Sequence, residues 1–420
     1  MKVLVIGGGG REHAVCRALS RSKRITKLLC APGNGGIASV AQCVPIAATD
    51  IPALVGYAKE NAVDFVVVTP DAPLALGLVD ALEEAGVKAF GPRANAAIIE
   101  SSKVFSKNLM RKYGIPTAEY EVFTELYAAE AYIREKGAPI VVKADGLALG
   151  KGVVVAETVD EALTAAREMM LDKKFGESGS RVVIEECMTG PEVTVLAFTD
   201  GKTICPMPSS QDHKRVFDGN KGPNTGGMGA FVPSPHYTPE IAKECMERIF
   251  RPTIDAMNSE GRPFKGVIYF GLMLTPKGPR VVEYNARFGD PEAQPLLTLL
   301  ETDLLDIFEA VREERLAELD IVWRDEAACC VVMASGGYPG AYEKGYEITG
   351  LDTVPNDIIV YHAGTTLDGG VYRTNGGRVL GVTATGPTLA KAAERAYDGV
   401  TCIHFKNAHY RKDIAKNIRF

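Results

Sequence analysis

The chain has 420 residues, more than the roughly 250 to 300 at which a single hydrophobic core stops growing, so several domains are expected. Its formal net charge of -6, from 47 Lys plus Arg and 53 Asp plus Glu, offers no general attraction to nucleic acid or anionic membranes, and neither is expected as a partner. No apolar run approaches the roughly 20 residues of a membrane-spanning helix, and the apolar run at 3–6 is too short for a signal peptide, so a cytoplasmic location is predicted. The nine Cys include no C-x-x-C pair, which argues against a disulfide framework and a thiolate zinc site.

Residues 1–100 alternate short apolar runs with helix-length amphipathic segments. This pattern is typical of a parallel sheet with covering helices, and it predicts a doubly wound α/β domain. Ligands of such sheets bind beyond the carboxyl ends of the strands. The loops that follow the predicted strands are 7–10, 32–36 and 69–71.

Residues 101–326 predict a second, α+β domain, and residues 327–420 a small β-rich domain that ends in a helix over 388–399. Helices are expected at 101–113, 159–171, 239–259 and 292–318. Strands are expected at 120–123, 140–143, 153–155, 182–186, 192–199 and 202–207, with a hairpin over 266–274 and 280–285. The stretch 209–229 is predicted to be a long polar loop with a function, because apolar Met207 and Phe231 flank it.

The glycine run Gly7 to Gly10 leads from a predicted strand into a predicted helix that carries Arg11. Backbone N–H groups at such a turn favour a bound anion. A dinucleotide fingerprint would need glycine where Glu12 or His13 stands, so a phosphate-bearing small molecule is preferred over a nicotinamide or flavin cofactor. A purely structural turn is the alternative.

The loop from Gly146 to Gly152 contains Lys151 and follows Lys143. It is one residue short of a Walker A loop, and no Ser or Thr follows the lysine. A glycine hairpin can still fold over a polyphosphate, with Lys143 neutralising charge. Taken alone, such a turn is more often structural than functional.

Glu283, Asn285 and Arg287 alternate at the end of a predicted strand, so their side chains share a face. A carboxylate beside an amide oxygen suits magnesium, which takes few protein ligands and completes its shell with phosphates and water. The Arg287 guanidinium can donate two parallel hydrogen bonds to a carboxylate or phosphoryl group. The alternative is a solvated polar face of a strand. His362 and His404 are expected to be buried core histidines.

These motifs together resemble a known superfamily. Lys103, Lys143 with its glycine loop, Glu185-Glu186, and Glu283-x-Asn285-x-Arg287 resemble ATP-grasp enzymes. More narrowly, the chain is similar to the phosphoribosylamine–glycine ligase family from Met1 to about Gly386. The strings that carry this similarity are GGGGREHA, SSQDHKR, GNKGPNTGGMGA, YNARFGDPE, ASGGYPG, HAGT and TNGGRVLGVTATG.

The resemblance implies that ATP, glycine and 5-phosphoribosylamine give glycinamide ribonucleotide, ADP and phosphate through a glycyl phosphate, in purine biosynthesis. It also implies Mg²⁺ or Mn²⁺, a monomer, and an ATP-grasp core with a mobile lid near residues 118–188. For ATP, it implies phosphate contacts from Lys103 and Lys143, closure of the loop with Gly146, Gly150, Lys151 and Gly152, adenine contacts at Glu185 and Glu186, and ribose contacts from Glu192. For the reacting groups, it implies metal ligands Glu283 and Asn285, an acyl phosphate contact from Arg287, and an amine and glycine site at Gly9, Gly10, Arg11, Asp212, Lys214 and Asp290.

One position departs from the family pattern. The family usually has G-P-E-A-P-L where this chain has Thr69-Pro70-Asp71-Ala72-Pro73-Leu74, so a substrate contact from the shorter Asp71 is open. Alternatives to the leading hypothesis are another ATP-grasp ligase or carboxylase, an NAD-dependent oxidoreductase, and a module that binds ATP without turnover.

Overall fold

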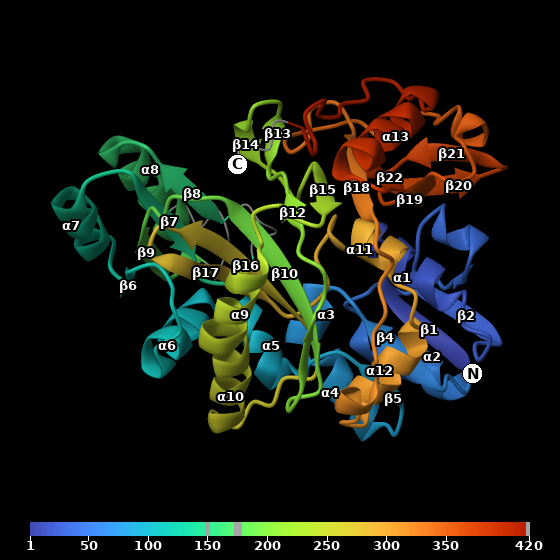
Figure 1. Cartoon of the computed structure of the whole chain (residues 1–420), viewed down its shortest axis with the longest axis horizontal. Coiled ribbons are helices and arrows are strands. Elements are labelled where there is room, and N and C mark those ends of the chain that lie inside the picture. Colours follow the sequence, from blue (N-terminus) through green and yellow to red (C-terminus); the bar gives the residue numbers. More distant parts are fainter. Residues whose placement is uncertain (148–151, 172–178, 417–420) are drawn as a thin grey trace.

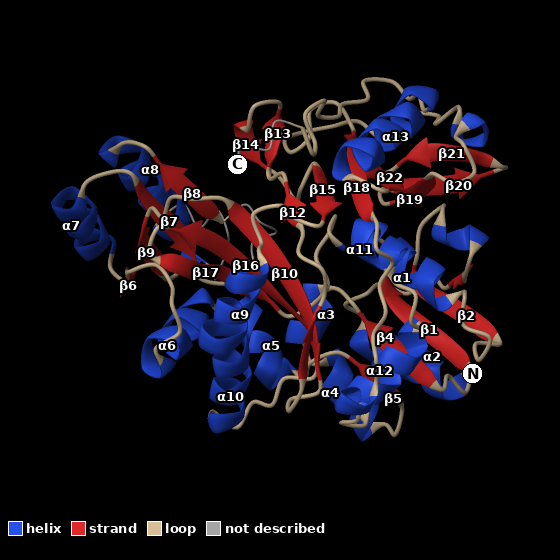
Figure 2. Ribbon diagram, viewed as in Figure 1, coloured by secondary structure: helices blue, strands red, loops and turns tan. Residues whose placement is uncertain are grey.

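The computed structural model describes residues 1–147, 152–171 and 179–416 (Figure 1). The N-terminal residues, in blue, form a sheet unit beside the C-terminal domain, in red, and a central sheet separates both from a small helix-covered sheet at the far side (Figures 1 and 2). No helix in these ranges is both long enough and apolar enough to cross a membrane.

The N-terminal sheet is parallel throughout, with the order β3-β2-β1-β4-β5, which confirms the predicted doubly wound α/β unit. Along β1, Leu4 and Ile6 enter one hydrophobic core and Val3 and Val5 another, so both faces of the sheet are buried. Its strands are β1 (Lys2–Gly7), β2 (Lys27–Pro32), β3 (Gln42–Cys43), β4 (Phe65–Val68) and β5 (Lys88–Phe90). Its helices are α1 (Gly10–Leu19), η1 (Ile37–Ser39), α2 (Ile51–Glu60), α3 (Asp71–Ala75) and α4 (Leu78–Glu84).

Two helices lead from this sheet to a small antiparallel sheet of order β6-β9-β7-β8. The helices are α5 (Ala94–Ser101) and α6 (Lys103–Tyr113), and the Ser102 hydroxyl accepts the Phe105 N–H at the start of α6. The sheet has its own apolar core against its two helices. It consists of β6 (Tyr120–Phe123), α7 (Leu126–Lys136), β7 (Ile140–Ala144), β8 (Val153–Ala156), α8 (Val159–Met170) and β9 (Val182–Glu186).

The central antiparallel sheet has the order β11-β10-β16-β17 and contains the predicted hairpin. Its strands are β10 (Glu192–Thr199), β11 (Ile204–Pro206), β16 (Gly266–Thr275) and β17 (Gly278–Asn285). The helix predicted over 239–259 is present as α9 (Pro239–Cys245), a π-helical turn at Met246–Phe250, and α10 (Arg251–Ser259). Pro252 has no N–H to donate to the carbonyl four residues earlier, and the wider turn lies just before it.

The prediction of an irregular loop over 209–229 was wrong. This stretch contains β12 (Gln211–Asp212), β13 (Arg215–Phe217) and β14 (Lys221–Asn224), and it ends where β15 (Gly229–Val232) begins. β13 and β14 pair as a hairpin, whose turn places Gly219 and Asn220 at φ +69 and +55. The strands are too short and too polar to show alternating hydrophobicity, so only the Asp218-Gly219-Asn220 turn could have indicated them.

The C-terminal domain contributes three strands to a sheet of order β12-β15-β18-β22-β19, which therefore runs across residue 327. Its elements are β18 (Ala327–Ala334), η5 (Leu351–Thr353), β19 (Ile359–His362), β20 (Thr365–Asp368), β21 (Val371–Thr374), β22 (Arg378–Gly386) and α13 (Leu389–Cys402). His362 is buried as predicted, but His404 is exposed, because the chain there is an isolated bridge rather than a core strand.

The stretch 292–318, predicted to be helical, is helical in three separate pieces. The segment forms α11 (Ala293–Leu299), α12 (Leu304–Arg312) and η4 (Leu316–Glu318). Leu300 is extended, and the Asp303 carboxylate accepts the Leu305 N–H, which starts a new helix. The continuous apolar periodicity concealed this break.

Candidate functional site

A cleft of about 410 Å³ lies where the N-terminal sheet, the central sheet, the small sheet and the C-terminal domain meet. It brings together most of the site residues that the sequence predicts. Those that line it are Arg11, Asp71, Lys103, Lys143, Gly146, Gly152, Glu185, Asp212, Lys214, Glu283, Asn285, Arg287 and Asp290.

One end of the cleft is a buried group of two lysines around one carboxylate. The Glu185 carboxylate on β9 receives Lys143 Nζ of β7 at 2.9 Å and Lys107 Nζ of α6 at 3.1 Å. Burial opposes ionisation of Glu185, yet the two lysines hold its pKa below the usual value. Burial lowers the pKa of Lys107 to about 8. Glu185 Oε1 is buried without a hydrogen-bond partner among the described residues, so an acceptor is left for a ligand.

Lys103 lies beside this group at the start of α6. Its Nζ donates to the Gly146 carbonyl at 2.9 Å, and burial, together with Lys143, lowers its pKa. Two nearby ammonium groups in a low-dielectric cleft favour a bound anion with several charges. Gly150 and Lys151 of the predicted phosphate loop lie outside the described residues.

Strand β17 carries the predicted metal ligands and is irregular where they occur. Gly271 pairs with Glu283, but Leu272 pairs with Val281, so Val282 is an extra, bulged residue. The bulge lets both Val281 and Tyr284 enter the core while Glu283 and Asn285 line the cleft. No hydrogen bond or ion pair engages the Glu283 carboxylate within the described part of the chain.

Two arginines from distant segments converge next to these residues. Arg287 Nη1 and Arg11 Nη1 both donate to the Phe288 carbonyl, at 3.1 and 3.2 Å. Arg287 also forms an ion pair with Glu100 at 2.8 Å and donates to Asn285 Oδ1 at 3.1 Å. Its Nε is buried without a partner among the residues described, so one donor remains for an anionic ligand.

Glu12 explains why the glycine turn departs from a dinucleotide fingerprint. Its carboxylate accepts the Gly9 N–H at 2.7 Å, Arg11 Nε at 2.6 Å and the Thr69 hydroxyl at 2.8 Å. It thereby fixes the turn and the Arg11 side chain from within the protein. Gly9 and Gly10 lie at this turn, close to Asp290 rather than in the lining of the cleft.

Charged groups of the cleft also converge around Lys214. Lys214 Nζ lies 3.0 Å from Asp212 and 3.2 Å from Glu192, and these carboxylates raise its pKa well above the usual value although burial opposes this. Glu292 is buried at the cleft, and burial followed by the charge of Asp212 raises its pKa to about 7.

Four of the predicted residues that the structure describes do not line the cleft: Gly9 and Gly10 at the turn, and the glutamates Glu186 and Glu192. Glu192 reaches it only through Lys214, and the Glu186 side chain turns outward to an ion pair with Arg280 at 2.5 Å. Several lining residues were given no individual role by the sequence analysis, although Thr225 and Gly226 lie in the stretch 209–229 that it predicted to be functional. The lining residues without such a role are Glu100, Lys107, Thr225, Gly226, Tyr269, Glu292, Tyr338 and Arg378.

Some of these residues carried a usable signal. Thr225 and Gly226, Glu292, Tyr338 and Arg378 stand inside the strings TGGMGA, FGDPE, ASGGYPG and GGRVLG that identify the family resemblance. Lys107 follows Lys103 by one helical turn and therefore shares its face. Glu100 and Tyr269 had no distinguishing pattern.

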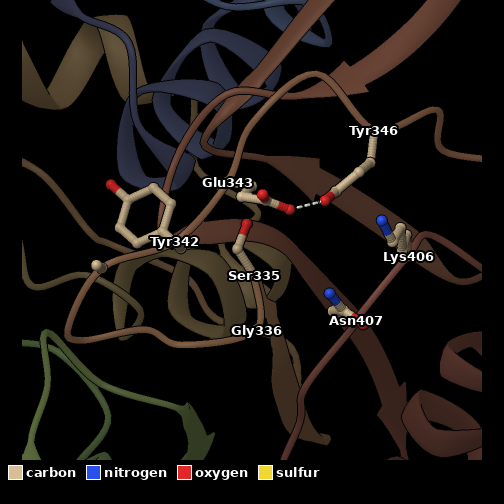
Figure 3. Close-up of a pocket in the computed structure, with 8 residues that line it drawn as sticks. Ser335, Gly336, Tyr342, Glu343, Tyr346, Lys406 and Asn407 are labelled. Carbon is tan, nitrogen blue, oxygen red and sulfur yellow. Dashed lines mark hydrogen bonds between the residues drawn. The ribbon is translucent and has the colours of Figure 1, made fainter.

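A second pocket in the C-terminal domain, of about 330 Å³, is a weaker candidate (Figure 3). Figure 3 shows Ser335, Tyr342, Glu343, Tyr346 and Lys406 around it. Tyr346 donates to Glu343, and Lys406 Nζ lies 4.8 Å from the centre of the Tyr346 ring, so both charged side chains are engaged with Tyr346.

The residues at Glu283 fit a divalent cation only in the company of a ligand. No group of three or more His, Cys, Asp or Glu side chains that could hold a metal occurs in ranges 1–147, 152–171 and 179–416. Glu283 supplies a carboxylate and Asn285 an amide oxygen, which is too few for an all-protein cage. This donor set suits a hard cation whose remaining ligands are phosphate oxygens and water.

Comparison with known proteins agrees with this geometry. Models of the phosphoribosylglycinamide synthetase N domain, ATP-grasp (A) domain and C domain match residues 1–100, 101–293 and 328–417. The chain is 50% identical to a phosphoribosylamine–glycine ligase of Rhizobium meliloti over 99% of this chain and 98% of the relative. The corresponding protein of Caldanaerobacter subterraneus subsp. tengcongensis is 47% identical, with 99% of each chain covered.

Solved structures show the same relationship. A crystal structure of phosphoribosylamine–glycine ligase from Thermotoga maritima has a TM-score of 0.85 and 33% identity, covering 99% of this chain and 100% of that one. The biotin carboxylase domain of Hydrogenobacter thermophilus 2-oxoglutarate carboxylase, at 17% identity and a TM-score of 0.73, shares the fold over 97% of this chain and 91% of that one. The predicted family is therefore confirmed: the chain belongs to the phosphoribosylglycinamide synthetase family, whose members are ligases with an ATP-grasp domain.

Proposed function

We propose that this protein joins glycine to 5-phosphoribosylamine at the expense of ATP, giving glycinamide ribonucleotide, ADP and phosphate in purine biosynthesis. The observation that carries the proposal is the convergence of Arg11 and Arg287 on the Phe288 carbonyl, in a cleft whose other end holds Lys103 and Lys143. In this proposal, an anion site from the N-terminal turn adjoins a polyphosphate site from the central and small sheets. Family membership supports the same reaction.

In the proposed reaction, an oxygen of the glycine carboxylate takes the γ-phosphoryl group of ATP, and ADP leaves. The amine nitrogen of phosphoribosylamine then attacks the carbonyl carbon of glycyl phosphate. The carbon–nitrogen bond forms, the carbon–oxygen bond to phosphate breaks, and the amine gives up a proton. This chemistry depends on positioning and charge neutralisation more than on a protein nucleophile.

The proposed nucleotide contacts use the two lysines and the unpartnered Glu185 oxygen at one end of the cleft. Lys103 and Lys143 would contact the phosphates beside the loop at Gly146 and Gly152, and Glu185 Oε1 would accept a hydrogen bond from the adenine. Gly150 and Lys151 remain part of this loop by prediction from the sequence. Glu186 and Glu192 are retained as adenine and ribose residues only through their place at the ends of β9 and β10.

The proposed reacting centre lies between the two ends of the cleft. Glu283 and Asn285 would hold Mg²⁺ or Mn²⁺, which supplies charge neutralisation to the phosphates when bound. The unpartnered Nε of Arg287 would contact the acyl phosphate. Asp212, Lys214 and Asp290 would receive glycine and the amine, with Gly9, Gly10, Arg11 and Asp71 around the sugar phosphate.

The remaining proposals concern the domain boundaries, a lid, the oligomeric state and the location of the protein. We propose that the domains divide at residues 100 and 326. We also propose that the segment 118–188 acts as a lid, because the small sheet has a separate core and covers the end of the cleft that holds Lys103 and Lys143, which we call the nucleotide end. Lid closure would exclude water from an acyl phosphate that water can hydrolyse. A monomer in the cytoplasm, with small molecules as partners, is proposed from the reaction and the family.

The test is the formation of ADP from ATP and Mg²⁺, with glycine and phosphoribosylamine supplied together or singly. Phosphoribosylamine is generated in the assay from ribose 5-phosphate and ammonia. The proposal expects ADP, and a product with the mass of glycinamide ribonucleotide, only when both are present. ADP formation that does not depend on glycine would point to a different carboxylate substrate.

A further inference from the structure

Arg378 connects the C-terminal domain to the cleft. It stands at the start of β22, and its Nη1 donates to the carbonyls of Gly226 and Asp290, each at 2.6 Å. Its Nη2 forms an ion pair with the Asp290 carboxylate at 3.1 Å. Burial would raise the pKa of Asp290, but Arg378 and Arg11 hold it below the usual value. One guanidinium therefore holds two separate segments of the cleft wall.

Tyr338 holds the same loop from the other side. Its hydroxyl accepts the Gly226 N–H at 2.9 Å, so both backbone polar groups of Gly226 are bound by side chains of the C-terminal domain. A Cβ at Gly226 would lie 3.0 Å from Cζ of Arg378, and a Cβ at Gly377 would overlap the Tyr338 ring. Glycine at 226 and 377 permits this close approach.

Gly226 is in turn tied to a charged group of the cleft. Both the N–H and the hydroxyl of Thr225 donate to the Lys214 carbonyl, at 2.8 Å each. The Gly227 N–H donates to the Thr225 hydroxyl at 2.9 Å, which closes the loop on itself. Contacts therefore run without interruption from Arg378 and Tyr338 through Gly226 and Thr225 to Lys214.

Asp290 extends this arrangement to the N-terminal turn. Gln294 Nε2 donates to Asp290 Oδ1 at 2.8 Å, and Gly9 and Gly10 lie directly against Asp290 and Gln294. Gly226 and Asp290, which Arg378 and Tyr338 hold, thus connect to Lys214 and to the turn at Gly9 and Gly10, and these residues form one connected region at the cleft. We call this the acceptor end, comprising residues 9–11, 212–214, 225–227 and 290 with Asp71.

We propose that Arg378 and Tyr338 are positioning residues that set the affinity of the acceptor end for the phosphorylated sugar amine and affect it far more than they affect ATP binding. The inference rests on the proposed function, because it takes phosphoribosylamine as the acceptor. It assigns a part in substrate recognition to two strings of the C-terminal domain, ASGGYPG and TNGGRVLG. The residues act through Gly226 and Asp290.

The test compares three variants with the wild-type protein in the ADP assay, varying phosphoribosylamine and ATP in turn. Arg378→Met loses a charge-assisted ion pair and two hydrogen bonds, and should raise KM for phosphoribosylamine roughly ten-fold or more. Tyr338→Phe loses one hydroxyl and should raise it only a few-fold. Arg378→Lys keeps the charge but loses the planar pair of guanidinium donors, and its KM for phosphoribosylamine should lie between those of wild type and Arg378→Met. KM for ATP, and ATP affinity by calorimetry, should stay within about two-fold of wild type.

Arg395→Met is the matched control, because Arg395 also donates to a carbonyl, that of Thr385, and pairs with a carboxylate, that of Asp357, in the same domain. It should leave both KM values unchanged. Equal rises in both KM values for Arg378→Met and Tyr338→Phe, or no change in KM for phosphoribosylamine, would overturn the inference. Failure of the proposed function would be seen in the wild-type protein itself. Its ADP formation would then not require both glycine and the amine.

Discussion

The two ends of the cleft are built in different ways. The nucleotide end takes Lys103, Lys107, Lys143 and Glu185 from residues 103–185, where buried ion pairs join Lys107 and Lys143 to Glu185 and Lys103 donates to the Gly146 carbonyl. The acceptor end combines short segments separated by up to several hundred residues, and backbone carbonyls hold them as much as side-chain charges do. The nucleotide end is thus a property of one small sheet and its neighbouring helix. The acceptor end exists only when all parts of the molecule are assembled.

The largest effect is expected between the two ends, at Glu283. The variant Glu283→Ala should lower turnover by about a hundred-fold or more, because a divalent cation on the phosphates loses its free carboxylate. Substrates should still bind, since neither end of the cleft changes. ADP formation against magnesium concentration measures this, with ATP calorimetry beside it, and Glu247→Ala on an exposed helical surface is the control. Wild-type magnesium dependence in Glu283→Ala would refute the assignment.

Acid should destabilise the folded protein through two buried histidines. His13 of α1 and His362 of β19 are buried, and the His362 N–H donates to His13 Nδ1 at 2.8 Å. Burial lowers their pKa values from 6.5 to about 3 and about 4. Because the unfolded chain binds more protons below pH 6.5, stability falls as the pH falls. Each histidine should lower the free energy of unfolding by about 2 kcal/mol between pH 6.5 and 4.5.

Denaturant unfolding at several pH values tests this expectation. In His13→Gln the side-chain oxygen can still accept the His362 N–H without titrating, so the loss of stability on acidification should shrink by about 2 kcal/mol. The variant His404→Gln, at an exposed histidine of the same domain as His362, should keep the wild-type slope. An unchanged slope in His13→Gln would show that His13 does not contribute to acid unfolding.

A smaller effect is expected at the nucleotide end. Lys143→Met should weaken ATP binding about ten-fold by calorimetry, because one of two lysines beside the polyphosphate is lost and Glu185 keeps only Lys107. KM for phosphoribosylamine should not change. Lys136→Met, at the exposed end of α7, serves as the control. If Lys143→Met binds ATP as tightly as wild type, the lysine is structural.

The smallest effect is expected at Asp71. Its Oδ1 accepts the Ala72 N–H at 2.9 Å at the start of α3, and it lines the acceptor end. Asp71→Glu restores the residue usual in the family and should change KM for phosphoribosylamine a few-fold, with KM for ATP constant. Asp80→Glu is the control, since the Asp80 carboxylate accepts the Ala94 N–H outside the cleft. Equal changes in the two variants would remove Asp71 from the substrate site.

The difference between the two ends also explains what the sequence could predict. The alternation of Glu283 and Asn285 and the glycine loop after Lys143 are local patterns, so they could be found without a structure. The bulge at Val282 was not visible, because it depends on how β17 pairs with β16. Arg378 and Tyr338 stand in strings that carry the family resemblance, but their spacing alone indicates no cleft. Their role depends on contacts with Gly226 and Asp290, which topology alone brings together.

The sheet that crosses residue 327 limits how the protein can be taken apart. β15 pairs with β18 along Gly229 to Val232, so a chain ending at 326 keeps every residue of the nucleotide end but exposes the free edge of β15. Unpaired strand edges promote association between copies. We expect this fragment to form oligomers in size-exclusion chromatography. Nor could the C-terminal domain be exchanged for that of another ligase as a module, because the graft would have to carry β15 and the loop at Gly226 with it.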